Sequence, residues 1–213
     1  MHIVHYNLTT AAKEGGVETF VWDLAGAQAR RGHRVTIVSG AGPVRRALPG
    51  VALRMTPFLD RGRLAFGPLR RAYAVRKLAE RLSMLPMALP LLRGADLVHI
   101  HKPYDLALGP LLRPRGVPLV YHGHGEDFFP GDRWLMGWAA ALLSCSSFNA
   151  ATLRARYGRA ATVVHNGVDI EHFRPLAPEP ALRAELLGGQ EHAVLLPSRM
   201  MPWKGHRHAI AAL

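Results

Sequence analysis

The chain holds only one cysteine among 213 residues, which excludes an internal disulfide. Cys145 lies in an apolar stretch, so we expect a buried thiol on a strand, in a reducing compartment. No apolar run approaches the roughly 18 residues of a membrane-spanning helix, and Pro86 and Pro90 interrupt the longest candidate, residues 84–92. Met1 leads directly into a strand pattern, without the basic and apolar regions of a signal peptide. These absences predict a cytoplasmic protein that does not span a membrane.

Acidic residues are also scarce: 15 Asp and Glu stand against 27 Lys and Arg, and the net charge of +12 predicts an anionic partner. Between Arg61 and Arg93 a single acid, Glu80, accompanies eight basic residues, with apolar residues at near-helical spacing. The segment fits a basic amphipathic helix on an anionic membrane or, as we favour, an arginine-rich solvated helix whose apolar side joins the core. Without zinc-finger, helix-turn-helix or aromatic-interleaved basic patterns, we expect no nucleic-acid partner. The basic residues are Arg61, Arg63, Arg70, Arg71, Arg76, Lys77, Arg81 and Arg93.

The dinucleotide fingerprint G-x-G-x-x-G and the phosphate-binding Walker loop are both missing. The chain instead alternates short apolar runs with segments of helical period, which predicts an α/β fold with a doubly wound parallel sheet, covered by helices on both faces. Its length fits one complete domain and the beginning of a second. The predicted strands are residues 3–6, 35–39, 51–55, 97–101, 119–122, 143–146, 162–165 and 193–197. The predicted helices are residues 17–28, 69–82, 134–141, 149–157 and 181–187.

In such sheets ligands bind beyond the carboxyl ends of the strands, so the residues there are the first functional candidates. Two His-x-His pairs, His99/His101 and His122/His124, occupy two of these ends, and the strand period of two places each pair on one face. We weigh three roles for them: single histidines that contact a sugar, which we favour, purely structural histidines, and ligands in a metal-dependent hydrolase. The acids that could complete a metal site are Asp105, Glu126 and Asp127.

Two further places in the sequence point to an anionic ligand. Gly15 and Gly16 follow the first predicted strand at a helix start, where residues without Cβ let backbone N–H groups approach a phosphate or a sugar. Near the end of the chain, Arg199 and Lys204 flank a short loop between a predicted strand and a predicted helix. A guanidinium can fork two phosphate oxygens, and an ammonium at the first helical position adds a point charge, so the pair predicts a diphosphate. Asn166 begins an Asn-Gly turn, which a purely structural role explains.

Taken in order, these motifs resemble the retaining family-4 glycosyltransferases of the GT-B fold, in which two Rossmann-like domains face each other across a cleft. The resemblance spans almost the whole chain. Each motif is weak alone, but six in the right order are specific. The segments that carry it are 15–18 (GGVE) with 24–25, 31–36 (RGHRVT), 96–101 (DLVHIH), 118–125 (PLVYHGHG), 166–175 (NGVDIEHFRP) and 198–205 (SRMMPWKG).

The resemblance implies that Gly15 and Gly16 approach the donor diphosphate, that His124 contacts the donor sugar, and that Arg199 and Lys204 neutralise the leaving diphosphate. His124 and the two cations are then the catalytic residues. The resemblance implies a nucleoside-diphosphate sugar as donor and a glycan, a lipid-linked group or a small molecule as acceptor. A cell-envelope polysaccharide and the inner face of the membrane are the setting we expect. No cofactor or metal is implied, because two fixed cations replace a divalent ion at the leaving group. The substrate-binding positions are His101 and Asn166.

We place the domain boundary within residues 166–180, where prolines cluster. Residues 1–174 are assigned to an acceptor-side domain, and 175–213 to a linker and the truncated start of the nucleotide-sugar-binding domain. Because the family's paired-glutamate motif belongs downstream of Lys204 and is not in this sequence, we expect little or no transfer by this chain alone. Two alternatives stay open: a lone binding module that acts at anionic lipid or with a partner in trans, and a metal-dependent hydrolase built on the two histidine pairs.

Overall fold

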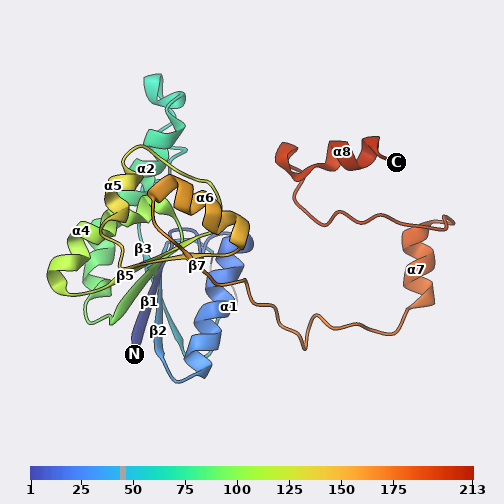
Figure 1. Cartoon of the computed structure of the whole chain (residues 1–213), viewed down its shortest axis with the longest axis horizontal. Helices are drawn as coiled ribbons and strands as arrows, with labels where there is room; N and C mark the ends of the chain where they lie inside the picture. The colour runs from blue at the N-terminus through green and yellow to red at the C-terminus, as the bar shows by residue number, and fades with distance from the viewer. Residues whose placement is uncertain (44–46) are drawn as a thin grey trace. The chain divides into compact units, whose positions relative to one another are not determined.

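The computed structural model describes residues 1–43 and 47–213, and it contains a seven-stranded sheet in which all neighbouring strands are parallel. The strand order is β3-β2-β1-β4-β5-β6-β7, so the chain builds outward in two opposite directions from its centre. Helices lie on both faces of the sheet (Figure 1). The predicted α/β, doubly wound fold is therefore confirmed. The strands are β1 (His2–Tyr6), β2 (Arg34–Gly40), β3 (Val51–Thr56), β4 (Leu97–Ile100), β5 (Leu119–Gly123), β6 (Ala141–Ser144) and β7 (Thr162–Val163).

Short polar and glycine signals set the bounds of the helices. The Ser146 side chain caps α6 by accepting a hydrogen bond from the Asn149 backbone N–H at 3.1 Å, and the helix ends at Gly158 in the left-handed conformation, with φ 66°. The α-helices are α1 (Gly16–Arg30), α2 (Tyr73–Ser83), α3 (Leu85–Ala88), α4 (Gly109–Leu112), α5 (Asp132–Met136), α6 (Ser147–Tyr157), α7 (Pro180–Leu187) and α8 (His206–Ala211). The 3₁₀ segments are η1 (Gly67–Arg70), η2 (Leu89–Leu92), η3 (Pro103–Leu108), η4 (Arg113–Arg115) and η5 (Pro202–Lys204).

The two faces of the sheet are filled differently. On one face, Val4, Val98 and Tyr121 belong to a large apolar core with buried residues from the helical segments between β3 and β7. On the other face, α1 packs Trp22 and Ala25 against β2 in a smaller core. Because successive side chains of a strand alternate between faces, the histidines next to those core residues in β1, β4 and β5 turn toward the α1 side.

Three predictions about local structure were wrong in part. The helix predicted over 134–141 is the shorter α5, and strand β6 begins at Ala141, because the apolar run there joins the sheet beside β5. As β6 ends at Ser144, Cys145 follows the strand and is half-buried, not a buried strand thiol. The strand predicted over 193–197 does not form. A single extended segment without a neighbour leaves its backbone groups unpaired, so apolar character alone does not produce a strand.

The structure divides into two compact units, Met1–Gly167 and Val168–Leu213. The division falls within the predicted zone of 166–180, before the predicted boundary at 174/175. The second unit contains α7, η5 and α8, and it exposes apolar side chains that include Leu195 and Trp203. Among the described residues, no helix combines the length and the apolar character that crossing a bilayer requires.

Candidate functional site

The sequence-predicted histidine pairs meet where the strand order reverses, between β1 and β4. This reversal is the place at which parallel α/β sheets bind ligands. In the register of these two strands, His5 lies opposite His99. His101 follows β4, while His122 lies near the end of β5 and His124 just beyond it. The structure thus brings both predicted pairs to one edge of the sheet and adds His5, which we did not predict as part of a site.

The five histidines form a continuous row of ring contacts. The ring centroids of His99 and His101 lie 4.4 Å apart, as do those of His122 and His124, and His5 lies 5.1 Å from His99. Phe20 of α1 places its ring edge-on to the row, 4.7 Å from His124 and 4.8 Å from His122. His124 is half-buried, whereas the other four are buried. His124 is therefore the member of the row most open to a ligand.

Hydrogen bonds connect three of these rings with α1. With its Nε2 proton donated to Gln28 Oε1 at 2.7 Å, His5 keeps a lone pair on Nδ1. That atom lies 3.3 Å from Nε2 of His101, whose Nδ1 lies 3.3 Å from Nε2 of His124. The set is consistent when each imidazole donates from Nε2 and accepts at Nδ1. Both ring nitrogens of His101 thus face other histidines of the protein, and the substrate-binding role of His101 stays a prediction.

Burial keeps the histidine row uncharged at neutral pH. It lowers the pKa of His5 to about 4, of His122 to about 4 and of His124 to about 3, because a charged imidazolium loses its hydration there. Burial also moves the pKa values of His99 and His101 well below the ordinary value, and repulsion from neighbouring histidines adds to this effect. Neutral imidazoles offer both a donor and an acceptor, which suits sugar hydroxyls and metal ions alike.

Gly15 and Gly16 lie at the start of α1, as predicted: Gly15 is the N-cap and Gly16 the first helical residue. The first N–H groups of a helix have no intrahelical acceptor, and the helix dipole favours an anion there. Glu18 lies in this first turn and accepts a hydrogen bond from the Thr9 hydroxyl at 2.5 Å. A Cβ on Gly15 would meet Glu18 Oε2 at 2.5 Å, so the carboxylate folds back toward the helix start. A bound diphosphate would have to displace it.

The acids considered for a metal site either form ion pairs with lysine or arginine or are exposed to solvent. Asp105 is buried and pairs with Arg81 at 2.6 Å, and Asp127 pairs with Lys77 and, at 3.8 Å, with Lys102. Glu126 is exposed. Burial lowers the pKa of Lys102, and the nearby Asp127 opposes this shift. Among the described residues, the group of side chains close enough to share an ion consists of His5, His99 and His101 and includes none of these acids. The suggestion that the carboxylates complete a metal centre with the histidines is therefore wrong.

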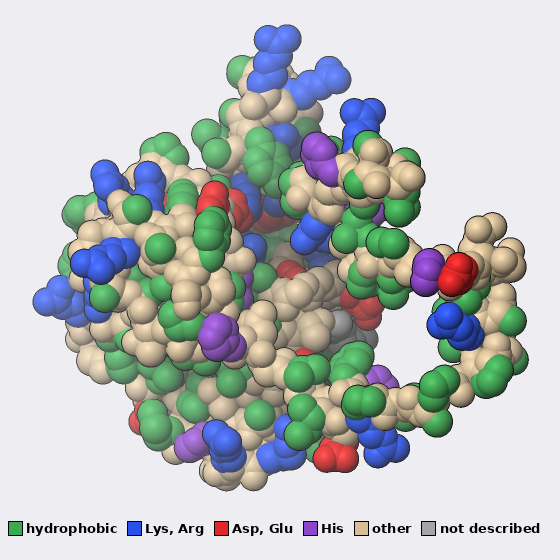
Figure 2. Space-filling model, turned by 45° about the vertical axis from the view of Figure 1, so that its right-hand side comes forward, with side chains coloured by type: hydrophobic (Ala, Val, Ile, Leu, Met, Phe, Trp, Pro, Cys, Tyr) green, Lys and Arg blue, Asp and Glu red, His purple; other side chains and the backbone are tan. Residues whose placement is uncertain are grey.

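The basic segment from Arg61 to Arg93 divides into buried and exposed parts. Lys77 and Arg81 of α2 turn inward to their acidic partners. Val75 and Leu82 of the same helix are exposed, so the interpretation we favoured, a solvated basic face with its apolar side in the core, was wrong for α2. The exposed part lies at the other end of the segment, where Lys and Arg side chains gather at the top of the molecule, over the start of α2 and the residues before it (Figures 1 and 2). Its exposed side chains are Arg63, Phe66, Arg70, Arg71, Tyr73 and Val75.

The remaining predicted residues lie outside the histidine row. Asn166 is exposed and follows β7, at the end of the first unit. Arg199 and Lys204 belong to the second unit and are exposed. Lys204 ends η5, and α8 begins only at His206, after Gly205 in the left-handed conformation. The prediction that Lys204 opens the helix was therefore wrong by two residues.

Comparison with known proteins gives a family and a fold. The model of Glycosyltransferase Family 4 matches residues 14–172. Among curated proteins, none matches the chain. The structure is similar to the catalytic domain of starch synthase IV from Arabidopsis thaliana bound to ADP and acarbose, with a TM-score of 0.62, 17% identity, and coverage of 99% of this chain and 66% of that one. It is also similar to sucrose-phosphate synthase from Thermosynechococcus elongatus, with a TM-score of 0.59, 15% identity, and coverage of 88% and 52%. The chain thus spans about half to two thirds of these proteins, and at such identities the likeness shows a shared fold.

Proposed function

We propose, on the premise that the chain belongs to glycosyltransferase family 4, that it takes part in moving a sugar from a nucleoside-diphosphate sugar to an acceptor glycan or lipid, with retention. The first unit supplies the acceptor side and the second unit begins the donor side. The observation that carries this proposal is the row of neutral, largely buried histidines at the carboxyl ends of β1, β4 and β5, packed against Phe20 and Gln28 of α1. The hydroxyl groups of a sugar are neutral, so a site that binds them needs hydrogen-bond donors and acceptors but no charged group.

His124 is the residue of this row that we assign to the sugar. Phe20 packs against one part of its ring, and His101 fixes one ring nitrogen, so the imidazole is held in place before a ligand arrives. Rigid placement of a hydrogen-bonding group lowers the entropy that the reaction must lose. Replacement of His124 by Asn keeps a polar group but removes the ring, and we expect it to lower transfer more than it lowers stability.

We assign the leaving diphosphate to Arg199 and Lys204. Cleavage of the bond between the sugar and the diphosphate builds negative charge on the leaving oxygen, and fixed cations stabilise that charge more in the transition state than in the ground state. The proposal gives no metal or cofactor a part in this step. The similar starch synthase structure is bound to ADP, which supports a nucleoside diphosphate as the ligand class.

The test compares the protein as its source cell makes it with the 213-residue chain. Each is assayed with a panel of nucleoside-diphosphate sugars carrying a labelled sugar, and the anomeric configuration of the product is read by NMR. Loss of Lys204 in the source protein should lower kcat/KM by about 10²–10³-fold. Arg207→Ala removes the same charge three residues away and should change it only a few-fold. Absence of donor use by the source protein would refute the function, and robust transfer by the 213-residue chain would refute the expected inactivity.

A peripheral membrane contact is part of this proposal, and it would place the protein at the cytoplasmic face of an anionic membrane. The exposed part of the basic segment supports it, because Arg70 and Arg71 are exposed in the same short stretch of chain as Phe66 and Tyr73. Cationic groups attract an anionic surface, while aromatic side chains enter the interface. The same surface would bring the enzyme to a lipid acceptor, or would serve the alternative role of a lone binding module.

Vesicle sedimentation tests the membrane contact. Vesicles with anionic lipid should bind the chain, and neutral vesicles or raised salt should release it, because surface electrostatics are screened within about 10 Å at 0.1 M salt. Arg70→Glu with Arg71→Glu should abolish the binding. Arg154→Glu, on the exposed side of α6, is the control for net charge. If the control lowers binding as much per charge as the double variant, then net charge and not this surface is responsible.

A further inference from the structure

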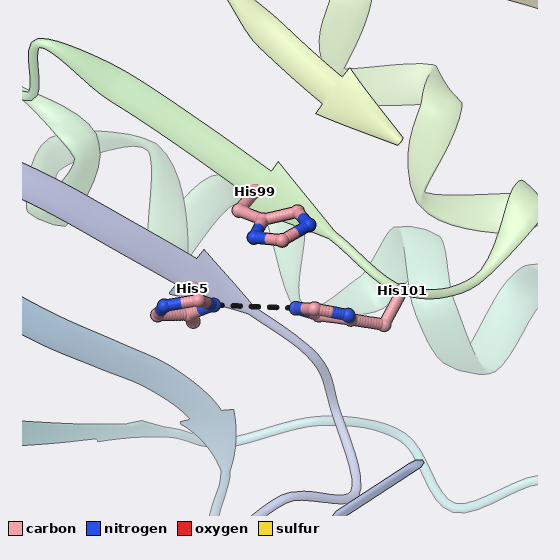
Figure 3. Close-up of side chains that lie close together, drawn as sticks. All are labelled: His5, His99 and His101. Atoms are coloured by element: carbon pink, nitrogen blue, oxygen red, sulfur yellow. Dashed lines mark hydrogen bonds between the residues drawn. The ribbon is translucent and has the colours of Figure 1, made fainter. Parts of the chain in front are cut away.

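We propose that His5, His99 and His101 form a binding site for a divalent cation of the zinc class. The three side chains are buried, and each offers a ring nitrogen such that the three nitrogens lie within 4.8 Å of one another. His5 extends from β1 and His99 from β4, while His101 follows β4, and the three rings surround a common point (Figure 3). The site would join the two central strands of the sheet where their order reverses.

The spacing of the nitrogens fits a tetrahedral ion. Nitrogens bound to zinc at about 2.0–2.1 Å in tetrahedral geometry lie about 3.4 Å from each other. His5 Nδ1 and His101 Nε2 are 3.3 Å apart, so an ion could join them with little movement of either ring. His99 lies over both, with centroid distances of 5.1 Å to His5 and 4.4 Å to His101. Three protein ligands leave one coordination position open.

The groups behind the ligands are those that a metal-bound imidazole requires. A ligating histidine donates its second ring N–H to an acceptor, which fixes the tautomer and the orientation of the ring. His5 has Gln28 Oε1 at 2.7 Å from Nε2, so its Nδ1 carries the lone pair. His101 has His124 Nε2 at 3.3 Å from Nδ1, which leaves Nε2 for the ion when Nδ1 is protonated. Two of the three ligands thus have their outer partners in place.

Without an ion, hydrogen bonds leave part of the cluster unsatisfied. In the part of the chain that the structure describes, the buried His99 Nε2 has no hydrogen-bond partner. Buried polar atoms without partners are rare, because each loses its hydration and gains nothing in return. A cation bound by His99 would remove part of this cost. Imidazole ligands without a carboxylate favour zinc, copper or nickel over magnesium and calcium.

The inference does not rest on the proposed transferase activity, because it is argued from the geometry of the three rings, and no step of sugar transfer uses the ion. The test therefore contains no nucleotide sugar. The 213-residue chain, freed of metal with a chelator that is then removed, is titrated with Zn²⁺ by calorimetry and with Co²⁺ by visible absorption. We expect one ion per chain, a tetrahedral Co²⁺ spectrum, and a rise in Tm with Zn²⁺ but not with Mg²⁺.

The variants distinguish this site from exposed histidines. His99→Asn should remove the tight site, while His172→Ala with His192→Ala, at exposed positions of the second unit, should leave it intact. Gln28→Leu serves in case His99→Asn does not fold: its side chain lies behind His5, and its loss should weaken Zn²⁺ binding by about 10-fold or more. Absence of tight Zn²⁺ and Co²⁺ binding by the unaltered chain would overturn the proposal. So would binding that survives in a folded His99→Asn variant, or that is lost with the exposed histidines.

Discussion

The ion pair between Arg81 and Asp105 should be the most sensitive electrostatic contact in the first unit. The two side chains are 5% and 1% exposed, and Arg81 Nη1 lies 2.6 Å from Asp105 Oδ2. Burial raises the pKa of Asp105, and the neighbouring guanidinium offsets part of this rise. Arg81→Met leaves the carboxylate buried without its counter-charge, which costs about 3–5 kcal/mol in comparable pairs. Because a domain is stable by only about 5–15 kcal/mol, this one change should remove a large part of the stability.

The assay is urea unfolding followed by circular dichroism, with two control variants. Arg71→Met removes a basic residue that is exposed on the same segment, and it should alter the free energy of unfolding by no more than about 0.5 kcal/mol. Arg81→Met combined with Asp105→Leu removes both charges, and it should recover much of the loss, since two apolar groups need no hydration. If Arg81→Met costs no more than Arg71→Met, or if the double variant is less stable than the single one, then the reasoning about buried charge is wrong.

Two further predictions concern the histidine row and the start of α1. With a chelator present, lowering the pH from 7 to 5 should lower the free energy of unfolding by about 2 kcal/mol through His122 alone. The pKa of His122 falls from 6.5 to about 4 on folding, so the unfolded chain binds more protons and stability is lost as the pH drops. Urea unfolding at both pH values measures the change. A free energy of unfolding that stays constant over this range would contradict it. Gly16→Ala should leave Tm unchanged, because no neighbouring atom lies within 4 Å of the added Cβ. The same change should weaken binding of the donor, because the Cβ holds the diphosphate away from the backbone. Equal donor binding by both forms would remove Gly16 from the site.

Local patterns predicted most of the sheet because each strand there carries its own apolar signal and also finds a neighbour. Residues 35–39 and 119–122 are examples, and they became β2 and β5 with small changes at their ends. Residues 193–197 carry a similar signal, but no strand within residues 1–43 and 47–213 pairs with them. Whether an apolar segment forms a strand thus depends on a neighbouring strand and not on the segment alone. A single-sequence pattern contains no information about whether that neighbour exists.

The candidate site was half predictable for a related reason. The His-x-His spacing at two strand ends marks His101 and His124, since it depends only on the period of a strand. His5 joins them through the pairing of β1 with β4, which brings it to His101, 96 positions away in the sequence. Gln28 joins through the docking of α1. The ion-pair partners of Asp127 and Asp105 lie 50 and 24 positions away in the sequence. The sequence pattern therefore identified the two acids but not the lysine and arginine that pair with them.

The two proposals meet at His101, and its protons connect them. In the metal-free chain of hydrogen bonds, His124 donates from Nε2 to His101 Nδ1, so His124 offers an acceptor at its own Nδ1. A cation on His101 Nε2 requires the proton of His101 on Nδ1, and His124 must then accept at Nε2 and carry its proton on Nδ1. Occupancy of the buried site would therefore decide whether His124 presents an acceptor or a donor to a sugar hydroxyl. A metal held away from the diphosphate could in this way alter donor binding without taking part in the chemistry.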